Sequence, residues 1–168
     1  MSNTMLIDGY ISANERVLDR NDPEGRVDFF VDEWGTWYDP EPGREPGFLY
    51  QQNSLRDALV AAINFNIFHE HARRVQMANI AQMVNVLQAM ILTDGPRMIL
   101  TPTYHAFEMY IPFQGATSLP VDVRTPRYRL GEMNVPAVTV SAARDTEGRL
   151  QLAIVNLDPI ARPLFRCG

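Results

Sequence analysis

The chain has 168 residues, of which 46% are hydrophobic and 21% charged, and its net charge at pH 7 is −5, so it can form one moderate core or two small ones. The 15 Lys and Arg are scattered without a basic stripe, which argues against nucleic acid as a partner. No stretch resembles a signal peptide or a membrane span, and the lone Cys167 excludes an intramolecular disulfide, so we expect a cytoplasmic protein without membrane contact.

The first predicted elements are a helix and a strand. Apolar residues recur at helical spacing over residues 4–19, and the turn-forming segment 21–25 ends that pattern. The apolar run 27–31 is typical of a buried strand in a parallel sheet. Asp32 and Glu33 follow it at once. Because ionised groups are costly in such a strand unless they sit at its end beside a polar cleft, they mark a candidate catalytic position.

A structural role for the two carboxylates stays open. Asp32 could cap the next turn while Glu33 pairs with an arginine such as Arg44, since structural ion pairs also occur at strand ends. Residues 38–47 are too rich in Pro and Gly for regular structure. They predict a loop, which either borders a cleft or is an ordinary surface excursion.

The next segments predict a helix and a second strand. Ser54 and Asp57 have the spacing of a capping box, so a helix should run from there to about His69. Its apolar residues form one stripe suited to packing on a sheet: Leu55, Leu59, Ala62, Ile63 and Ile67. Residues 75–80 read as a strand. The order helix, strand, helix, strand is that of a parallel sheet with right-handed crossovers.

The remaining chain predicts a hairpin, a helix and then strands. Apolar residues 90–92 and 98–100 flank a turn, and Thr101 and Pro102 can start a helix that stops at Pro112. Beyond about residue 115 only strands are expected, the last two forming an antiparallel hairpin around the turn 145–148. The predicted strands are residues 118–123, 137–143 and 150–156.

The histidines give little support for a metal or cofactor. His69 and His71 lie two residues apart on a predicted helix, where side chains diverge, and no acidic or cysteine cluster accompanies them. Capping of the helix C-terminus is the favoured role. His105, near a predicted helix start, is interpreted as a residue that either packs or supports a site indirectly, and not as a catalytic one. No glycine-rich phosphate loop occurs, so no cofactor and no metal are expected.

Five motifs in this order resemble a known family. They are DEWGTWYD (residues 32–39), GFLYQQN (47–53), SLRDAL (54–59), RVQMANIAQMVNVLQ (74–88) and LTPTYH (100–105). Together they resemble the second half of the α-L-arabinofuranosidases of glycoside hydrolase family 51. The resemblance covers most of residues 5–157, and the ordered set is far more specific than any single motif.

The resemblance implies an α/β plus β fold. Residues 1–114 would form the C-terminal part of a (β/α)₈ TIM barrel, including its strands seven and eight, and residues 115–168 the truncated start of an antiparallel β-sandwich domain. The implied activity is the retaining hydrolysis of terminal non-reducing α-L-arabinofuranosyl residues of arabinan, arabinoxylan and arabino-oligosaccharides. By this match Glu33 is the nucleophile, Trp37 forms a wall of the furanose pocket, and Gln82 hydrogen-bonds the sugar. Full-length relatives are often homo-oligomers.

The second catalytic carboxylate of a retaining glycosidase is expected to be absent from this chain. It should stand about 5 Å from the nucleophile, and in the family it follows an Asn at the end of barrel strand four. The one Asn-Glu pair here, Asn14-Glu15, lies inside the predicted first helix, eighteen positions before Glu33. Two further βα units of about 30 residues each cannot fit in that interval. Glu15 is therefore interpreted as a solvated helix residue.

Without that acid, we expect a chain that carries the nucleophile but is inactive alone. It would be a truncated reading frame or the partner of an upstream polypeptide, with unpaired strand edges that favour association. The alternative is a non-enzymatic carbohydrate-binding or assembly module that uses the barrel remnant as an interaction surface. The expected partner in either case is an arabinofuranosyl carbohydrate.

Overall fold

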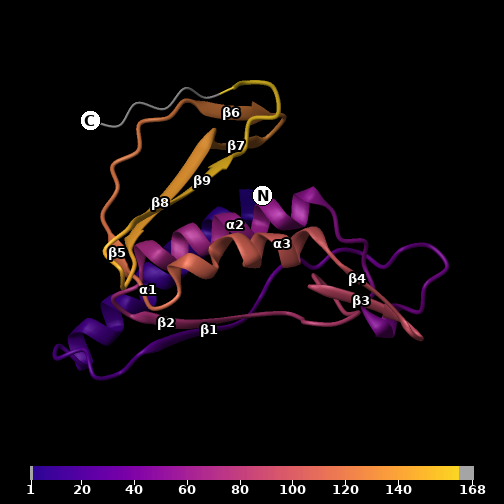
Figure 1. Ribbon diagram of the computed structural model, residues 1–168, viewed down its shortest axis with the longest axis horizontal. Coiled ribbons are helices and arrows are strands. Elements are labelled where there is room, and N and C mark those ends of the chain that lie inside the picture. Colours follow the sequence, from indigo (N-terminus) through magenta and orange to yellow (C-terminus); the bar gives the residue numbers. More distant parts are fainter. Residues whose placement is uncertain (1, 163–168) are drawn as a thin grey trace.

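The computed structural model describes residues 2–162, and its elements form stacked layers (Figure 1). Strands β1 and β2 run along the bottom of the view, α2 and α3 lie above them, and a sheet of β5, β8 and β9 packs on the far side of α2. The elements are η1 Ser2–Met5, α1 Leu6–Asn21, β1 Phe29–Trp34, η2 Pro46–Phe48, α2 Leu55–Glu70, β2 Val75–Ile80, β3 Ile91–Asp94, β4 Arg97–Leu100, α3 Pro102–Tyr110, η3 Ile111–Phe113, β5 Thr117–Leu119, β6 Arg127–Leu130, β7 Met133–Pro136, β8 Val138–Arg144 and β9 Leu150–Asn156.

The predicted parallel unit is present. Strands β1 and β2 pair in parallel, and α2 connects them, as the order of elements predicted. The capping box also forms: the side chain of Ser54 accepts from the backbone N–H of Asp57, and the carboxylate of Asp57 accepts from the backbone N–H of Ser54. Strand β1 begins two residues later than predicted and continues through Asp32 and Glu33 to Trp34.

The predicted apolar stripe of α2 is only partly correct. Leu55 is 70% exposed, while Val60, Ala61 and Phe68, outside that stripe, are buried. The reason is that α2 is covered from several directions, by the β1–β2 pair, by α3, by η1 and α1, and by β8 and β9. A helix at the centre of a core buries more than one face.

The side chains of the two histidines at the end of α2 bind neighbouring elements. The capping interpretation is nevertheless confirmed for His71, which is the C-cap residue and whose backbone N–H donates to the carbonyl of Ile67 at 3.2 Å, and it is wrong for His69. Nδ1 of His69 lies 2.9 Å from Oγ of Ser141 in β8. Nδ1 of His71 lies 2.8 Å from Glu15, and its Nε2 lies 2.8 Å from Asp8. The interpretation of Glu15 as a solvated residue is therefore also wrong: its side chain is only 15% exposed.

The two imidazoles have opposite electrostatic surroundings. Burial lowers the pKa of His69 to about 4. Burial also disfavours protonation of His71, but its hydrogen bonds to Asp8 and Glu15 outweigh that cost, so its pKa lies above the ordinary value. Asp8 and Glu15 are seven residues apart on α1, hence on one helix face, and for that reason both reach the same ring.

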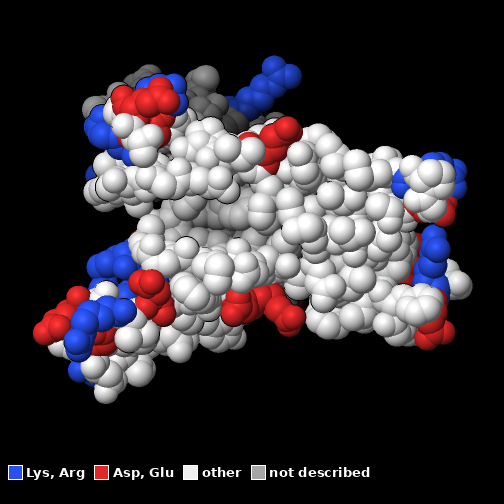
Figure 2. Space-filling model, turned by 60° about the horizontal axis from the view of Figure 1, so that its bottom comes forward, with Lys and Arg blue, Asp and Glu red and all other residues white. Residues whose placement is uncertain are grey.

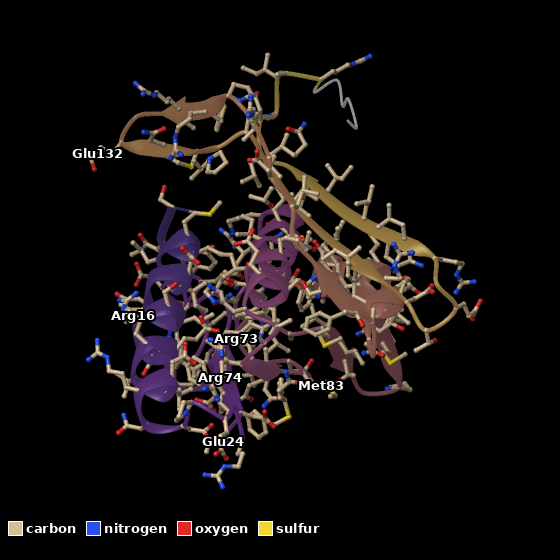
Figure 3. All side chains as sticks on the ribbon, turned by 90° about the vertical axis from the view of Figure 1, so that its left-hand side faces the viewer. Arg16, Glu24, Arg73, Arg74, Met83 and Glu132 are labelled. Carbon is tan, nitrogen blue, oxygen red and sulfur yellow. The ribbon has the colours of Figure 1, made fainter. Side chains whose placement is uncertain are left out.

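A buried arginine joins α1 to the start of β2. Arg74 is 2% exposed, and its guanidinium donates to the carboxylates of Asp19 and Asp22 and to the backbone carbonyl of Val27. Hydrogen bonds from Arg73 and Arg74 hold the pKa of Asp19 below its usual range. The pKa of Asp22 is also lowered, by the hydrogen bond from the backbone N–H of Val27 and by the bond from Arg74. Figure 3 shows Arg73 and Arg74 beside α1.

The C-terminal strands largely follow the prediction. The β8–β9 hairpin and the β3–β4 hairpin both form with antiparallel pairing. Strand β5 is shorter than predicted because Pro120 cannot donate to a ladder. The hairpin of β6 and β7 was not predicted; it turns at Gly131, whose φ of 56° suits a tight hairpin turn. Cys167 lies outside the described residues.

The outer face of the β1–β2 pair carries no covering layer within residues 2–162. Phe30 is 48% exposed and its partner Met77 is 43% exposed. Figure 2 turns this side forward and shows a broad uncharged field with the charged side chains gathered toward its borders. Each of the two strands has one unpaired edge within the described part of the chain, as expected. None of the helices described there is long and apolar enough to cross a membrane.

Candidate functional site

Strand β1 ends in a β-bulge that carries the two candidate carboxylates. Val31 pairs with Ala78 and Trp34 pairs with Ile80, so Asp32 and Glu33 together face one residue of β2. Glu33 has a φ of 57°, a left-handed conformation that costs a residue with a side chain about 1 kcal/mol or more. Bulges of this kind re-aim a side chain at the end of a strand, often beside an active site.

The two carboxylates have different surroundings. Asp32 accepts a hydrogen bond from the side-chain amide of Asn79 on β2. Glu33 is exposed and forms no hydrogen bond or ion pair with any residue from 2 to 162. Arg44, the suggested structural partner, instead places its guanidinium 4.6 Å from the centre of the Tyr50 ring. The interpretation of the pair as a turn cap and an Arg44 ion pair is therefore wrong.

The bulge is held in place by Trp34, which is 4% exposed. Its ring packs edge-on against Phe65 and Phe68, with centroids 5.4 and 5.5 Å away, and stacks on Phe107. Each such aromatic pair adds about 0.5–1.5 kcal/mol beyond the buried area. The backbone of Trp34 also accepts from the N–H of Ala81 at 2.9 Å, which joins the ends of β1 and β2.

Gly35 allows the two strand ends to approach each other. Its φ of 152° is rarely adopted by other residues, and a Cβ there would lie 3.2 Å from the carbonyl oxygen of Ala81. A side chain at this position would separate the segment after β1 from the segment after β2. Glu33 and Gln82 lie close in sequence to this contact. Their positions relative to each other therefore depend on a glycine at position 35.

Trp37 is 68% exposed, yet the backbone on both sides of it is anchored. The hydroxyl of Thr36 donates to the carboxylate of Asp57 at 2.9 Å. The side-chain amide of Gln51 donates to the carbonyl and the hydroxyl oxygen of Thr36, and its oxygen accepts from the N–H of Tyr38. The loop thus presents an exposed indole on a rigid base.

Sequence reasoning missed Gln51 and the second role of Asp57. Gln51 is 4% exposed, and Asp57 is fully buried, although both are polar. Asp57 was assigned only to the capping box, but it serves the cap and the Trp37 loop at once. The motif 47–53 contains the polar Gln51, and the motif 54–59 contains the charged Asp57. These residues were visible in the sequence, but their spacing did not show that both bind Thr36.

Gln82 follows β2 directly and is exposed. Its loop is supported from beneath by Gln88, whose backbone N–H donates to the carbonyl of Ala81 and whose side-chain amide donates to the carbonyl of Asp57 at 2.7 Å. The same amide lies 3.2 Å from Oγ1 of Thr103 on α3. The loops after β1 and β2 are therefore braced against each other through the start of α2.

The structure brings two of the three candidates into one cavity. Glu33 and Trp37 both line a hollow of about 630 Å³ beside η1 and α2, and Gln82 is not part of its wall. Gln82 shares with them only the carboxyl edge of the β1–β2 pair. Among residues 2–162, Glu33 is the sole carboxylate that lines this cavity. No group of three His, Cys, Asp or Glu in the described part could hold a metal ion.

Comparisons with known proteins agree on one family. Residues 32–159 match the model of the α-L-arabinofuranosidase C-terminal domain. The chain is 41% identical over 159 residues to the intracellular exo-α-L-arabinofuranosidase of Bacteroides ovatus, covering 94% of this chain and 31% of that protein. It is 25% identical to the exo-α-(1→6)-L-arabinofuranosidase of Bifidobacterium longum, covering 89% of this chain and 32% of that protein.

Solved structures give the same result. The crystal structure of the family 51 arabinofuranosidase from Xanthomonas axonopodis pv. citri superposes with a TM-score of 0.92 at 58% identity, over 95% of this chain and 32% of that one. The thermostable enzyme from Thermotoga petrophila superposes with a TM-score of 0.76 at 26% identity, over 93% of this chain and 34% of that one. The chain thus spans about a third of the length of the relatives it matches.

Proposed function

The chain belongs to the α-L-arabinofuranosidases of glycoside hydrolase family 51, and from that membership we propose that it carries the catalytic nucleophile of a retaining arabinofuranosidase, Glu33. The observation that supports this proposal is the exposed Glu33 carboxylate on a bulge, with no partner within residues 2–162, in one cavity with an exposed tryptophan. A nucleophile must be ionised, accessible and not occupied by a structural bond.

In the proposed reaction, a carboxylate oxygen of Glu33 bonds to C1 of a terminal arabinofuranosyl residue while the bond from C1 to the leaving oxygen breaks. A general acid transfers a proton to that oxygen. Water then attacks C1, gives its proton to the same acid/base group and releases Glu33. Trp37 provides an apolar wall for the ring, and the carboxamide of Gln82 can donate to and accept from the sugar hydroxyls.

The general acid is proposed to come from polypeptide outside this chain. No other carboxylate among residues 2–162 lines the cavity of Glu33. The β1–β2 pair would be strands seven and eight of a (β/α)₈ barrel within residues 1–114, with residues 115–168 belonging to a β-sandwich domain. The substrates would be arabinan, arabinoxylan and arabino-oligosaccharides with terminal non-reducing α-L-arabinofuranosyl residues. We also propose that the full-length protein is cytoplasmic and forms a homo-oligomer.

The decisive experiment is a chimera in which this chain replaces the matching third of the Xanthomonas axonopodis enzyme. An arabinofuranosyl cyclitol aziridine should label the chimera at Glu33, as read by peptide mass spectrometry. Glu33→Gln should prevent labelling, whereas the control Glu24→Gln, at a carboxylate that is 72% exposed beside Arg26, should not. Labelling at another residue, or normal turnover of the Glu33→Gln chimera, would refute the assignment.

The isolated chain should hydrolyse p-nitrophenyl arabinofuranoside at least about 10²-fold more slowly than the chimera, because general acid help is worth about 10²–10⁴ in rate. If the isolated chain turned over the substrate at a rate near that of the chimera, the proposal that the general acid lies outside this chain would be refuted.

A non-enzymatic carbohydrate-binding or assembly module is the second candidate, favoured by the open apolar face with Phe30 and Met77. For that function, Glu33→Ala should leave sugar binding unchanged and the aziridine should label nothing. Loss of labelling with Glu33→Gln, together with efficient turnover by the unaltered chimera, would exclude it.

A further inference from the structure

One side-chain hydrogen bond joins β1 to β2 at the bulge that carries Glu33. Asn79 is the residue of β2 that lies opposite the bulge, between the two residues that pair with β1 on either side of it. Its side-chain amide donates to Oδ1 of Asp32, the residue directly before Glu33. Among residues 2–162, Asn79 is the only hydrogen-bond partner of the Asp32 carboxylate. This bond therefore ties the first residue of the bulge to the neighbouring strand.

The bonded pair lies on the open outer face of the two strands. Asn79 stands two positions after Met77, which is 43% exposed on that face. Side chains two positions apart in a strand point to the same side, and Asp32 must reach that side to accept the bond. Both members of the pair are exposed. The bond is thus separate from the buried contacts that hold the other end of the bulge.

Glu33 lies between these two kinds of contact. On one side, Trp34 is fixed by its aromatic neighbours in the core. On the other side, Asp32 is fixed by Asn79. The left-handed conformation of Glu33, with a φ of 57°, persists only where the surroundings enforce it. A hydrogen bond to an ionised carboxylate is stronger than one between neutral groups, which suits it to this task.

The position of the Glu33 carboxylate matters for its proposed reaction. An attacking atom must lie about 3–3.5 Å from the carbon it attacks, and a misplacement of about 1 Å can lower the rate by about 10²-fold. Neither Asp32 nor Asn79 lines the cavity shared by Glu33 and Trp37. Loss of their bond should therefore slow the attack on C1 while the binding of the furanose is retained.

We propose that Asn79 is a positioning residue for the nucleophile. Through its bond to Asp32, it holds the bulge in the conformation that presents the Glu33 carboxylate. Asn79 acts through the backbone that joins Asp32 to Glu33, and it does not itself take part in the reaction. The inference rests on the proposed function, because it requires Glu33 to be the attacking group.

The test measures labelling of the chimera by the arabinofuranosyl cyclitol aziridine, with the dissociation constant KI and the rate constant kinact determined separately. Asn79→Asp places a carboxylate of the same shape against Asp32, and the repulsion should lower kinact about 10²-fold. Asn79→Ala only removes the bond and should lower kinact about tenfold. KI should change by less than about threefold in both variants, because the sugar contacts remain.

A reciprocal substitution and a matched control show whether the bond itself is responsible. Asp32→Asn together with Asn79→Asp exchanges donor and acceptor without changing the net charge, so it should restore kinact to within about threefold of the unaltered chimera. Gln76→Ala is the control, because Gln76 is an exposed carboxamide on the same strand that donates to the carbonyl of Ala72 at 2.7 Å. The control should change neither KI nor kinact.

The outcomes separate this inference from the proposed function. Unchanged kinact in both Asn79 variants would overturn the inference, and labelling at Glu33 would still support the nucleophile. Slow labelling that the double substitution does not restore would also overturn it, because the bond would not be the cause. If the unaltered chimera is not labelled at Glu33, both proposals fail. If Asn79→Asp does not fold, Asn79→Ala and the double substitution decide the question by the same criteria.

Discussion

The carboxyl edge of the β1–β2 pair and the junction at the end of α2 use polar residues in opposite ways. At the edge, Glu33, Trp37 and Gln82 are exposed, and Glu33 has no partner within residues 2–162. At the junction, His71 and Arg74 bind two carboxylates each. Unpaired polar groups are tolerated at the edge because water or a ligand can satisfy them, whereas at the junction the protein itself must.

The edge nevertheless depends on buried residues beneath it. Asp57, Gln51 and Gln88 are nearly inaccessible, and they fix the loops whose exposed side chains would contact a ligand. The exposed candidate site residues are therefore held in place by buried, hydrogen-bonded side chains, as preorganised sites require. The comparison predicts that substitutions at the edge change activity with little effect on stability, and that substitutions at the junction do the reverse.

The largest expected effect is that of Glu33→Gln on the chimera. Removing a nucleophile should lower kcat by roughly 10⁴-fold or more. Because Glu33 is exposed and has no partner within the described residues, the melting temperature should stay within about 2 °C of that of the unaltered chimera. Steady-state kinetics and thermal unfolding measure the two quantities. A large loss of stability would mean that Glu33 has a structural role in the folded chain.

The second prediction compares two adjacent arginines by thermal unfolding. Arg74→Lys should lower the melting temperature of the chain by more than about 5 °C, because a single ammonium cannot replace bonds to Asp19, Asp22 and the Val27 carbonyl. Arg73→Lys is the matched control: its side chain is 62% exposed, and it binds only Asp19. If both substitutions lowered the melting temperature equally, the buried ion pairs of Arg74 would contribute no more to stability than the exposed ion pair of Arg73.

The third prediction uses the opposite pKa shifts of the two histidines. The folded pKa of His71 is raised, so its stabilisation is complete below its ordinary value of 6.5 and is lost as the pH rises through the folded value. The deficit in melting temperature of His71→Gln should therefore be largest near about pH 5.5 and shrink in alkaline buffer. A deficit that is constant with pH would show that the ion pairs with Asp8 and Glu15 contribute nothing.

His69 should show the reverse dependence. Its folded pKa of about 4 lies below 6.5, so the unfolded chain binds the proton first and stability falls as the pH drops from 6.5 to about 4. This loss is up to about 3 kcal/mol, and His69→Gln should remove that part of the acid sensitivity. Urea unfolding at a series of pH values measures it. An unchanged acid profile would mean that the imidazole is hydrated in solution.

The smallest expected effect is that of Thr36→Val in the chimera. The substitution keeps the shape but deletes the hydroxyl that joins Asp57 and Gln51 beneath Trp37. A loosened indole should lower kcat/KM about tenfold or less, in line with about 1 kcal/mol for a lost hydrogen bond. Thr146→Val, in the exposed β8–β9 turn, is the control and should have no effect. If both variants keep full activity, the anchored loop does not position Trp37.

Local sequence signals predicted the elements well and their contacts poorly. The capping box and the β3–β4 and β8–β9 hairpins depend on residues close in the chain, and they formed as expected. The parallel β1–β2 pair joins distant residues, and it was predictable from the order of the elements because a strand, helix and strand in sequence favour a right-handed parallel unit. The β6–β7 hairpin was missed, although the turn residues Gly131 and Glu132 between Leu130 and Met133 were a usable signal. Glu15 was misread because its partner, His71, lies 56 residues away.

The sequence by itself determined the order of the elements, the family and the candidate carboxylate, because periodicity, capping and motif order are carried by neighbouring residues. Only the tertiary structure decided which of the two carboxylates has a partner, since that depends on a bulge and on Asn79 in another strand. It also decided that Glu33 and Trp37 share a cavity while Gln82 does not. Such pairings depend on the packing of distant segments, which no local pattern encodes.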